Sequence, residues 1–371
     1  MKYIGFYGNP NEQGVSPAAV NKMNYIYHAL KESGFSPQII ACNMVSDKGM
    51  KAADEEINGI CVHYFTRLVK SHFKLLRICQ VFRQNIILFF WLLCHVKRKE
   101  SVLVYHSLGL MRCVYWAKKI KKFQMILETE EIYNDVFLKS KLSQKMEKKF
   151  IACADKYIFP TELLHRQLNT EKKPYVLIHG TYQVEPDRGE RFEDDKIHVV
   201  YAGTFDPIKG GAVTTTITTR WLPENYHVHI LGFGTEEQKS KLLDLMEQTN
   251  RKSAAKVSYD GCLSGEEYIC FLQKCQIGMS TQNPDAAFNA TSFPSKILSY
   301  MANGLRVVSV RIPAIEGSAV GGDIYYYEEQ TPQRIAEAII SVDFEDGYNG
   351  RERIRRLDKR FIREMTQLLE K

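Results

Sequence analysis

Apolar and polar positions along the chain follow two alternating patterns. Short apolar runs alternate with longer segments in which apolar residues recur every third or fourth position. The first pattern is typical of buried strands and the second of amphipathic helices, so together they predict an α/β protein with parallel sheets. The strands predicted in the first half are residues 3–7, 38–42, 102–105, 125–127, 156–159 and 175–178. Those predicted in the second half are residues 198–201, 227–231, 256–259, 277–279 and 306–310.

Residues 183–196 interrupt this pattern. The stretch is polar and highly charged, and it contains Pro186 and Gly189, which is the composition of a linker. We therefore predict two sheets in two domains, residues 1–185 and 195–345, and an amphipathic helix over residues 351–371. A chain of 371 residues is long enough for two domains of ordinary size.

Charge is unevenly distributed around a net value of +7. Basic residues are densest over residues 60–99, which contain no acidic residue. The apolar run 86–94 within this stretch is much shorter than the roughly 20 residues that cross a bilayer, so we expect no membrane span there. Two interpretations remain open, an amphipathic segment lying on an anionic membrane and a buried helix with solvated lysines around it. No nucleic-acid-binding module is recognisable, and we expect no nucleic-acid partner.

Composition is ordinary for a soluble protein, with 44% hydrophobic and 25% charged residues. The nine cysteines form no Cys-x-x-Cys pair, and most lie in apolar runs, which favours reduced thiols in a cytoplasmic protein. The first predicted strand is too short to be the apolar core of a signal peptide, so we expect none.

Residues 293–309 combine a turn, a helix and a buried strand. Pro294 can open the helix, Ser295 can cap it, and Gly304 can end it in the left-handed conformation. Lys296 adds positive charge to the first turn, so this end can bind a phosphate. The alternative is an ordinary core helix with three apolar residues facing inward. Those residues are Ile297, Leu298 and Met301.

Three further glycine-containing segments precede this one in a fixed order. Residues 199–211 contain Gly203 followed by Lys209 and Gly210, residues 230–234 read Ile-Leu-Gly-Phe-Gly, and residues 257–261 read Val-Ser-Tyr-Asp-Gly. In this order and spacing the four segments resemble the donor-sugar site of the GT-B glycosyltransferases. The resemblance is to the retaining enzymes of family 4, in the polysaccharide-assembly version with a Phe-Pro-Ser-Lys turn.

The resemblance implies the fold and the roles of individual residues. It implies two Rossmann-like domains that face each other across a cleft, with the last helix crossing back to the first domain. Lys209 and Lys296 are the implied diphosphate-binding, catalytic cations. The implied donor-binding residues are Gly203, Thr204, Gly210, Gly232, Gly234, Tyr259, Gly261, Phe293, Pro294, Ser295 and Ser299.

The sequence also departs from the family. Thr204 stands where an arginine is common, and Thr291 and Ser299 replace the two glutamates typical of family 4. A hydroxyl can accept a hydrogen bond from ribose, but a carboxylate forms one roughly twice as strong. These departures cast doubt on donor affinity before they cast doubt on the fold.

Loops after the strands of the first half supply candidates for the acceptor side. In the family, the loop containing Gly14 and Ser16 lies near the transferring sugar, although from the residues alone a plain turn is favoured. His106 follows one strand, and Glu128 and Glu130 follow the next. The three carboxylates of residues 128–131 should raise one another's pKa, unless they form a solvated turn at a helix start. The resemblance assigns the acceptor-side role to Glu128 or Glu130, with His106 nearby.

The resemblance implies transfer of a sugar, with retention, from a nucleoside-diphosphate sugar to a glycan or polyprenyl-linked acceptor. This hexosyltransferase-like activity would serve capsule, exopolysaccharide or lipopolysaccharide assembly at the inner face of the cell membrane. We expect no metal ion or cofactor, because no Asp-x-Asp motif lies in a suitable loop. The alternatives are a pseudo-enzyme that retains the fold as a binding partner and a sugar-nucleotide epimerase, for which further carboxylates and histidines would be needed.

Overall fold

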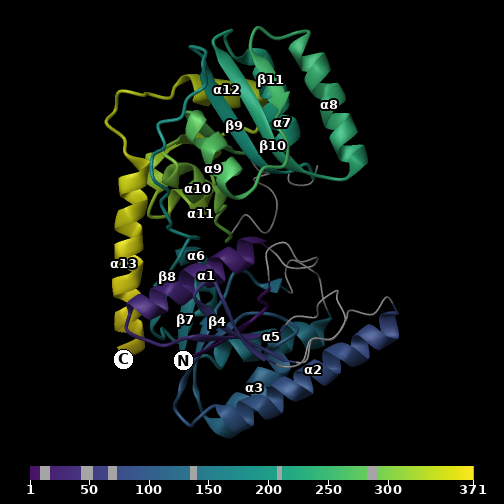
Figure 1. Ribbon diagram of the computed structural model, residues 1–371, viewed down its shortest axis with the longest axis vertical. Helices are drawn as coiled ribbons and strands as arrows, with labels where there is room; N and C mark the ends of the chain where they lie inside the picture. The colour runs from purple at the N-terminus through teal and green to yellow at the C-terminus, as the bar shows by residue number, and fades with distance from the viewer. Residues whose placement is uncertain are drawn as a thin grey trace. The chain divides into compact units, whose positions relative to one another are not determined.

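The computed structural model describes residues 1–8, 17–42, 53–65, 73–133, 140–206, 211–281 and 291–370. The chain divides into two compact units. Unit 1 comprises residues 1–178 and 360–371, and unit 2 comprises residues 179–359. In each unit a predominantly parallel sheet is flanked by helices, as the alternating apolar pattern predicts (Figure 1).

Unit 1 is built on an eight-stranded sheet in the order β3-β4-β2-β1-β5-β6-β7-β8. Its strands are β1 (Lys2–Gly5), β2 (Gln38–Ala41), β3 (Ala53–Ile57), β4 (Ile60–Tyr64), β5 (Ser101–Tyr105), β6 (Gln124–Glu128), β7 (Lys156–Phe159) and β8 (Tyr175–Leu177). Its helices are α1 (Pro17–Glu32), α2 (Lys74–His95), α3 (Met111–Lys121), α5 (Lys141–Ala152) and α6 (Glu162–Leu168).

The core of unit 1 lies where α2, α3 and α5 cover the sheet. Ile4 and Val104 of the central strands pack in one cluster with Leu92 of α2, Val114 of α3 and Phe150 of α5. All five side chains are completely buried. Strands that are apolar on both faces are typical of a parallel sheet covered on both sides, and this explains the near-continuous apolar runs that made them predictable.

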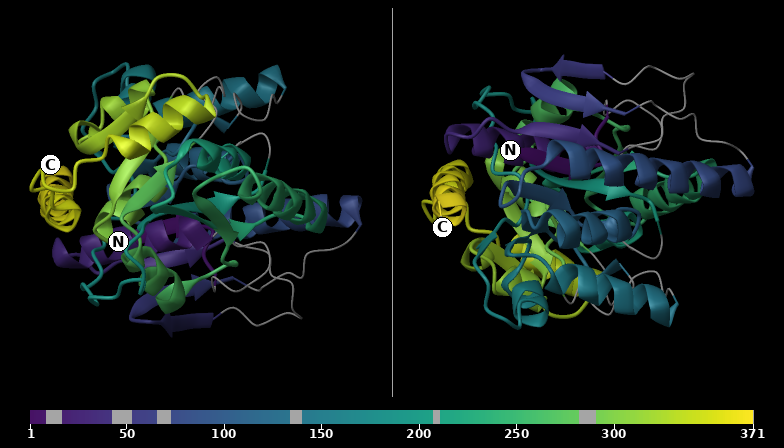
Figure 2. Two further views of the ribbon diagram at one scale, coloured as in Figure 1. Left: turned by 90° about the horizontal axis from the view of Figure 1, so that it is seen from above. Right: turned by 90° about the horizontal axis from the view of Figure 1, so that it is seen from below.

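An antiparallel hairpin of β3 and β4 extends one edge of this sheet (right panel of Figure 2). The apolar pattern of the sequence does not reveal this hairpin. The acidic strand Ala-Asp-Glu-Glu-Ile does not look apolar, because it is an exposed edge strand. Asn58 and Gly59 connect the two strands with φ values of 51° and 78°, and Asn-Gly between two strands is a strong hairpin signal that could have revealed it.

Unit 2 contains a six-stranded parallel sheet in the order β11-β10-β9-β12-β13-β14. Its strands are β9 (Ile197–Thr204), β10 (Tyr226–Phe233), β11 (Lys256–Tyr259), β12 (Ile277–Ser280), β13 (Arg306–Val310) and β14 (Ile324–Tyr327), of which β14 was not predicted. Its helices are α7 (Gly211–Thr218), α8 (Glu236–Asn250), α9 (Gly265–Lys274), α10 (Lys296–Ala302), α11 (Pro313–Glu316) and α12 (Pro332–Ile340). Single 3₁₀ turns cover Thr219–Trp221 and Gly321–Asp323.

The predicted linker, residues 183–196, belongs to unit 2, and the chain divides just before it, after Ile178. Gln273 of α9 holds this segment by donating to the carbonyl oxygen of Pro186 and accepting from the backbone N–H of Arg188, both at 3.0 Å. The last helix, α13 (Gly350–Glu370), begins in unit 2, and from Arg360 onward it belongs to unit 1. There Phe361 packs against Tyr25 of α1.

Helix α2 corrects the expectation that no segment here is long enough to span a membrane. Among the described residues it is the one helix whose length and composition would allow this, over Ile78–His95. The apolar run 86–94 is nine residues long, whereas the helix that contains it extends over 22 residues. In the structure Leu88 and Leu92 are buried in the core of unit 1, and the opposite face is exposed. The helix is therefore amphipathic and part of a folded layer.

Candidate functional site

The carboxyl ends of β9 and β10 approach each other closely in unit 2. Gly203 and Gly232 are direct partners in the parallel ladder. A Cβ added to Gly232 would lie 1.7 Å from the carbonyl oxygen of Gly203, and Gly232 has φ +135°, so only glycine fits there. Ligands of open α/β sheets bind at this end of the strands.

Lys296 lies over this strand end. Its Nζ atom is 4.2 Å from the ring centroid of Tyr201, which is a cation–π contact, and it is 2.9 Å from the position of a Cβ added to Gly203. The Tyr201 hydroxyl donates to the carbonyl oxygen of Thr204 at 3.2 Å. Burial, followed by the charge of Asp206, raises the pKa of Tyr201 to about 12. The ring therefore stays neutral and holds the ammonium group beside the glycines.

Helix α10 carries Lys296 in its first position. Gly304 follows the helix with φ +90°, which confirms the predicted left-handed end. Ser295 was expected to cap the helix, but its side chain makes no capping hydrogen bond and its backbone is already helical. Ile297, Leu298 and Met301 are buried, so α10 is also the core helix of the alternative interpretation. The structure therefore confirms the core helix, and phosphate binding at its first turn stays a prediction.

Ser299 contacts the neighbouring helix. Its side chain is hydrogen-bonded to the hydroxyl of Tyr268 on α9. Burial raises the pKa of Tyr268, and this hydrogen bond opposes the increase. No local pattern predicts this pairing, because 31 positions separate the two residues.

The end of β11 adds an aromatic side chain. The Tyr259 hydroxyl donates to the carbonyl oxygen of Gly232 at 3.1 Å. Phe205 meets its ring edge to face, and Lys239 lies 5.3 Å from its centroid. Gly261, with φ +99°, accepts a hydrogen bond from the N–H of Gly232 through its carbonyl oxygen. These contacts bring Gly203, Gly232 and Tyr259 together, as predicted, and add Tyr201 and Lys239, which the sequence analysis missed.

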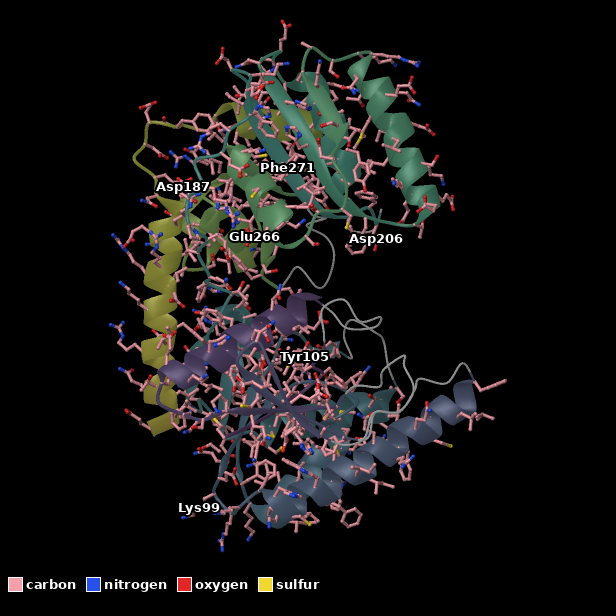
Figure 3. The ribbon with its side chains drawn as sticks, viewed as in Figure 1. Lys99, Tyr105, Asp187, Asp206, Glu266 and Phe271 are labelled. Carbon is pink, nitrogen blue, oxygen red and sulfur yellow. The ribbon has the colours of Figure 1, made fainter. Side chains whose placement is uncertain are left out.

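Some of the remaining predicted residues lie in the described part of the chain, and the others lie outside it. Phe293, Pro294 and Thr291 lie in the segment just before α10, where Phe293 packs against the ring of His179. Gly234 has no room for a side chain, because an added Cβ would lie 2.9 Å from Phe205. Asp206 ends the described part of the strand β9 loop (Figure 3). Four predicted site residues lie outside the described residues: Gly14, Ser16, Lys209 and Gly210.

In unit 1, Glu128 at the end of β6 is only 1% exposed. The Tyr3 hydroxyl donates to its Oε2, and Lys22 Nζ lies 3.9 Å from its Oε1. Burial raises the pKa of Glu128 to about 7, opposed by Lys22 and reinforced by Glu130. Repulsion among the carboxylates was expected to raise a pKa, and one is raised, but desolvation is the larger cause.

The other two predicted residues of unit 1 differ from each other in exposure. His106 is completely buried, with its Nε2 3.2 Å from Oε1 of Glu147, itself 1% exposed. Glu130 is partly exposed and bonded to Lys22. Burial of His106 and Glu128 favours a structural role for both, and among these three predicted residues Glu130 is the accessible one. Lys22 was missed, although α1 starts at the same edge of the sheet as these loops.

Three histidines form the one group of described residues that could offer several ligands to a metal ion. They are His198, His227 and His229, whose nearest nitrogens lie within 4.8 Å of one another. Hydrogen bonds already occupy several of these atoms. His198 Nδ1 and His229 Nε2 are 2.9 Å apart, and their outer nitrogens face Asp194 and Asp260 at 2.7 and 3.1 Å. The group is a polar network beside the rings of Phe192 and Phe271, of which Phe271 is labelled in Figure 3.

Comparison with known proteins supports the fold. No family description matches the sequence, and no curated protein matches it. The solved structure of an α,α-trehalose 6-phosphate synthase from Burkholderia multivorans is similar, with a TM-score of 0.67 at 11% identity over 99% of this chain and 94% of that chain. The structure of Alr3699/HepE from Anabaena in complex with UDP and glucose has a TM-score of 0.64 at 11% identity, covering 100% and 97%.

A glycosyltransferase from Rickettsia africae is similar as well, with a TM-score of 0.59 at 11% identity over 100% of this chain and 95% of that chain. Identities this low carry information about architecture, and the full-length coverage applies to both units. The chain has the GT-B fold.

Proposed function

We propose that this protein is a glycosyltransferase that takes a sugar from a nucleoside-diphosphate sugar. The observation that carries the proposal is the position of Lys296, whose ammonium group lies beside Gly203 at the carboxyl end of β9. A diphosphate needs positive charge, and Lys296 supplies it at the carboxyl end of the strands, where ligands of open α/β sheets bind. The names of the similar structures agree, because they include UDP-forming synthases and a complex with UDP and glucose.

Catalysis in this proposal consists of stabilising the charge that develops on the departing diphosphate. Lys296 is the described cation placed for this task, and Lys209 is proposed as the second. We propose transfer with retention, in which the acceptor hydroxyl attacks from the face that the diphosphate leaves. Glu130 is the proposed acceptor-side carboxylate, since it is partly exposed. No metal or cofactor is invoked.

The proposed acceptor is a glycan or a polyprenyl-linked sugar in polysaccharide assembly, met at the inner face of the cell membrane. Helix α2 supports membrane association, because it exposes large apolar side chains. Leu75 is 79% exposed, Phe82 68% and Phe90 59%. Lys97 and Lys99 follow at the end of the helix and are exposed, and basic side chains near an anionic membrane contribute about 1 kcal/mol each.

A pseudo-enzyme is the second candidate, and Ser299 is the observation that favours it. The residue that replaces the ribose-binding glutamate of the resembling family is already bonded to Tyr268. Donor binding would then be weak, and the fold would serve as a binding partner. A sugar-nucleotide epimerase is less favoured, because His106 and Glu128 are buried.

A thermal-shift screen of the full chain against UDP-, GDP-, ADP- and dTDP-sugars tests the proposal. A ligand at about 100 times its dissociation constant stabilises the folded state by about 2.7 kcal/mol, which is readily measured. We expect one nucleotide family to raise the midpoint, and the matching nucleoside diphosphate alone to raise it as well. If none of the four raises it, the pseudo-enzyme is favoured.

A further inference from the structure

Three histidines gather on one face of the unit 2 sheet. His227 and His229 are two positions apart in β10, and side chains two apart on a strand point to the same face. His198 of β9 is the direct partner of His227 in the parallel ladder. One nitrogen of each ring lies within 4.8 Å of those of the other two. Three possible metal ligands therefore converge from two neighbouring strands.

The outer nitrogens of two of these rings are each held by a carboxylate. His198 Nε2 lies 2.7 Å from Oδ1 of Asp194, and His229 Nδ1 lies 3.1 Å from Oδ2 of Asp260. An ionised carboxylate only accepts hydrogen bonds, so each ring carries its N–H on the outer nitrogen and its lone pair on the inner one. A carboxylate in this position orients a metal-binding histidine and makes it a stronger ligand.

The inner nitrogens of the same two rings face each other. His198 Nδ1 and His229 Nε2 are 2.9 Å apart. Two lone pairs repel at this distance, so the space between them requires a shared proton or a metal ion. Nitrogens about 2.0–2.1 Å from a tetrahedral Zn²⁺ are about 3.4 Å apart, so the two rings need to separate by only about half an ångström. The bonds to the carboxylates can remain in place.

Aromatic rings shield the histidines from water. Phe192 stacks on His198 with the ring centroids 4.0 Å apart, and on His229 at 5.0 Å. Phe271 meets His229 edge to face at 5.2 Å. His198 and His229 are each 2% exposed, whereas His227 is partly exposed. The His227 side is therefore where an ion and a water molecule as fourth ligand can enter.

The ligand set selects the metal, and its position separates it from the proposed donor site. Imidazole nitrogens suit Zn²⁺, whereas Mg²⁺ and Ca²⁺ prefer oxygen ligands. His198 precedes Gly203 by five residues in β9, which is about 17 Å along the strand. An ion at the histidines therefore does not contact the diphosphate, and its effect is on the stability of unit 2.

We infer that His198, His227 and His229 bind one Zn²⁺ ion, with Asp194 and Asp260 orienting two of the rings. The ion joins β9 to β10 and, through the two carboxylates, joins them to the segment before β9 and to the end of β11. The inference goes beyond the proposed glycosyltransferase function, because the ion takes no part in sugar transfer and its binding requires no nucleotide.

Calorimetric titration of the metal-free full chain with Zn²⁺ tests the site directly. A phosphine reductant keeps the cysteines reduced, and Mg²⁺ is the comparison ion. We expect one Zn²⁺ per chain, no binding of Mg²⁺, and a higher midpoint of thermal unfolding when Zn²⁺ is bound. If the wild type does not bind Zn²⁺, the inference is wrong and the histidines are only a hydrogen-bonded network.

Co²⁺ in place of Zn²⁺ distinguishes this site from the free cysteines, several of which are exposed. Co²⁺ bound by nitrogen ligands absorbs in the visible range, and cysteine thiolates add a charge-transfer band in the near ultraviolet. We expect the visible bands to saturate at one Co²⁺ per chain without the thiolate band. A thiolate band that saturates at the same ratio would place the ion on cysteines and overturn the inference.

Two substitutions locate the ion. His227→Gln changes a partly exposed ring, so we expect the fold to be retained and the affinity for Zn²⁺ to fall at least tenfold. His229→Gln should have the same effect on affinity. In both variants Zn²⁺ should no longer raise the unfolding midpoint.

His28→Gln is the matched control, because His28 is an exposed histidine on α1 of unit 1. It should bind Zn²⁺ as the wild type does. Wild-type affinity for Zn²⁺ in both His227→Gln and His229→Gln would contradict the inference.

Discussion

At the scale of single residues, the central feature is one lysine beside two glycines. Gly203 and Gly232 bring two strands so close that no side chain fits at Gly232, and the charged group of Lys296 lies beside Gly203. Tyr201 holds the ammonium group through its ring. This positive charge at the carboxyl end of the strands is what the proposed diphosphate site requires.

Lys296→Ala should therefore weaken nucleoside diphosphate binding. A hydrogen bond to a charged group contributes about 1.5–3 kcal/mol, so we expect roughly ten- to hundred-fold weaker affinity in calorimetric titration. Lys252→Ala is the control, since Lys252 is exposed and precedes β11, at the opposite end of the strands. Equal affinity in wild type and Lys296→Ala would mean that the phosphate site lies elsewhere.

Ser299→Glu should tighten nucleotide binding by restoring a carboxylate for ribose hydroxyls, because charge-assisted hydrogen bonds are roughly twice as strong as neutral ones. Ser299→Gln has the same size without the charge, and it should give no gain. The measurement is calorimetric titration with the preferred nucleotide. If Ser299→Glu binds no better than Ser299→Gln, the pocket holds ribose in another way, or the hydrogen bond to Tyr268 is itself required.

Glu128 makes stability depend on pH. Its pKa is raised to about 7 in the folded protein, against an ordinary value of 4.5. Burial favours the neutral acid in the folded protein. The contribution of Glu128 to the free energy of unfolding is therefore fully present below about pH 4.5, and it is lost as the pH rises to about 7. Glu128→Gln should flatten this part of the stability profile in urea titrations between pH 4.5 and 8. Exposed Glu32→Gln should not, and a Glu128→Gln profile as steep as that of the wild type would contradict the burial argument.

At the scale of elements, the core strands were predictable and the edge strands were not. Arg306–Val310 and Lys156–Phe159 are buried at every position, and their bounds were predicted without error. The hairpin of β3 and β4 was missed, because its outer strand is acidic and exposed. The pairing of Ser299 with Tyr268 could not be predicted, since it depends on how two helices pack.

Helix α2 is a second case in which tertiary packing decides what the sequence alone cannot predict. Its apolar run was visible in the sequence, but the division between a buried face and an exposed face depends on the sheet beneath it. Leu88 and Leu92 pack into the core, whereas Phe82 and Phe90 remain exposed. An amphipathic helix with aromatic side chains on its free face is suited to the membrane interface.

Phe82→Glu/Phe90→Glu should therefore reduce co-sedimentation with anionic vesicles severalfold, because it removes apolar contact and adds like charge. Wild-type association should also fade between about 0.1 and 1 M salt, as the Debye length falls from about 10 Å to about 3 Å. Association that is equal for neutral and anionic vesicles and indifferent to salt would make α2 an ordinary core helix. Leu243→Glu, on α8 of unit 2, is an exposed apolar control.

At the scale of the whole molecule, the order of short segments was more informative than any one of them. Each glycine turn was compatible with a plain connection, and the four in sequence indicated the GT-B fold that the structure has. The boundary between the two units was harder to predict. Residues 183–196 look like a linker, but they belong to unit 2, where Gln273 holds them.

The central claim is that this fold transfers sugar from a nucleoside-diphosphate donor. The most direct measurement is a transfer assay with the nucleotide-sugar that stabilises the protein and with membrane lipid extract as the source of acceptor, monitored by nucleoside diphosphate release and by NMR of the product. The account predicts release that depends on the acceptor, a product with the anomeric configuration of the donor, and a loss of at least tenfold in Lys296→Ala. Binding of the nucleotide-sugar with no release in the presence of acceptor, or a product of inverted configuration, would contradict it.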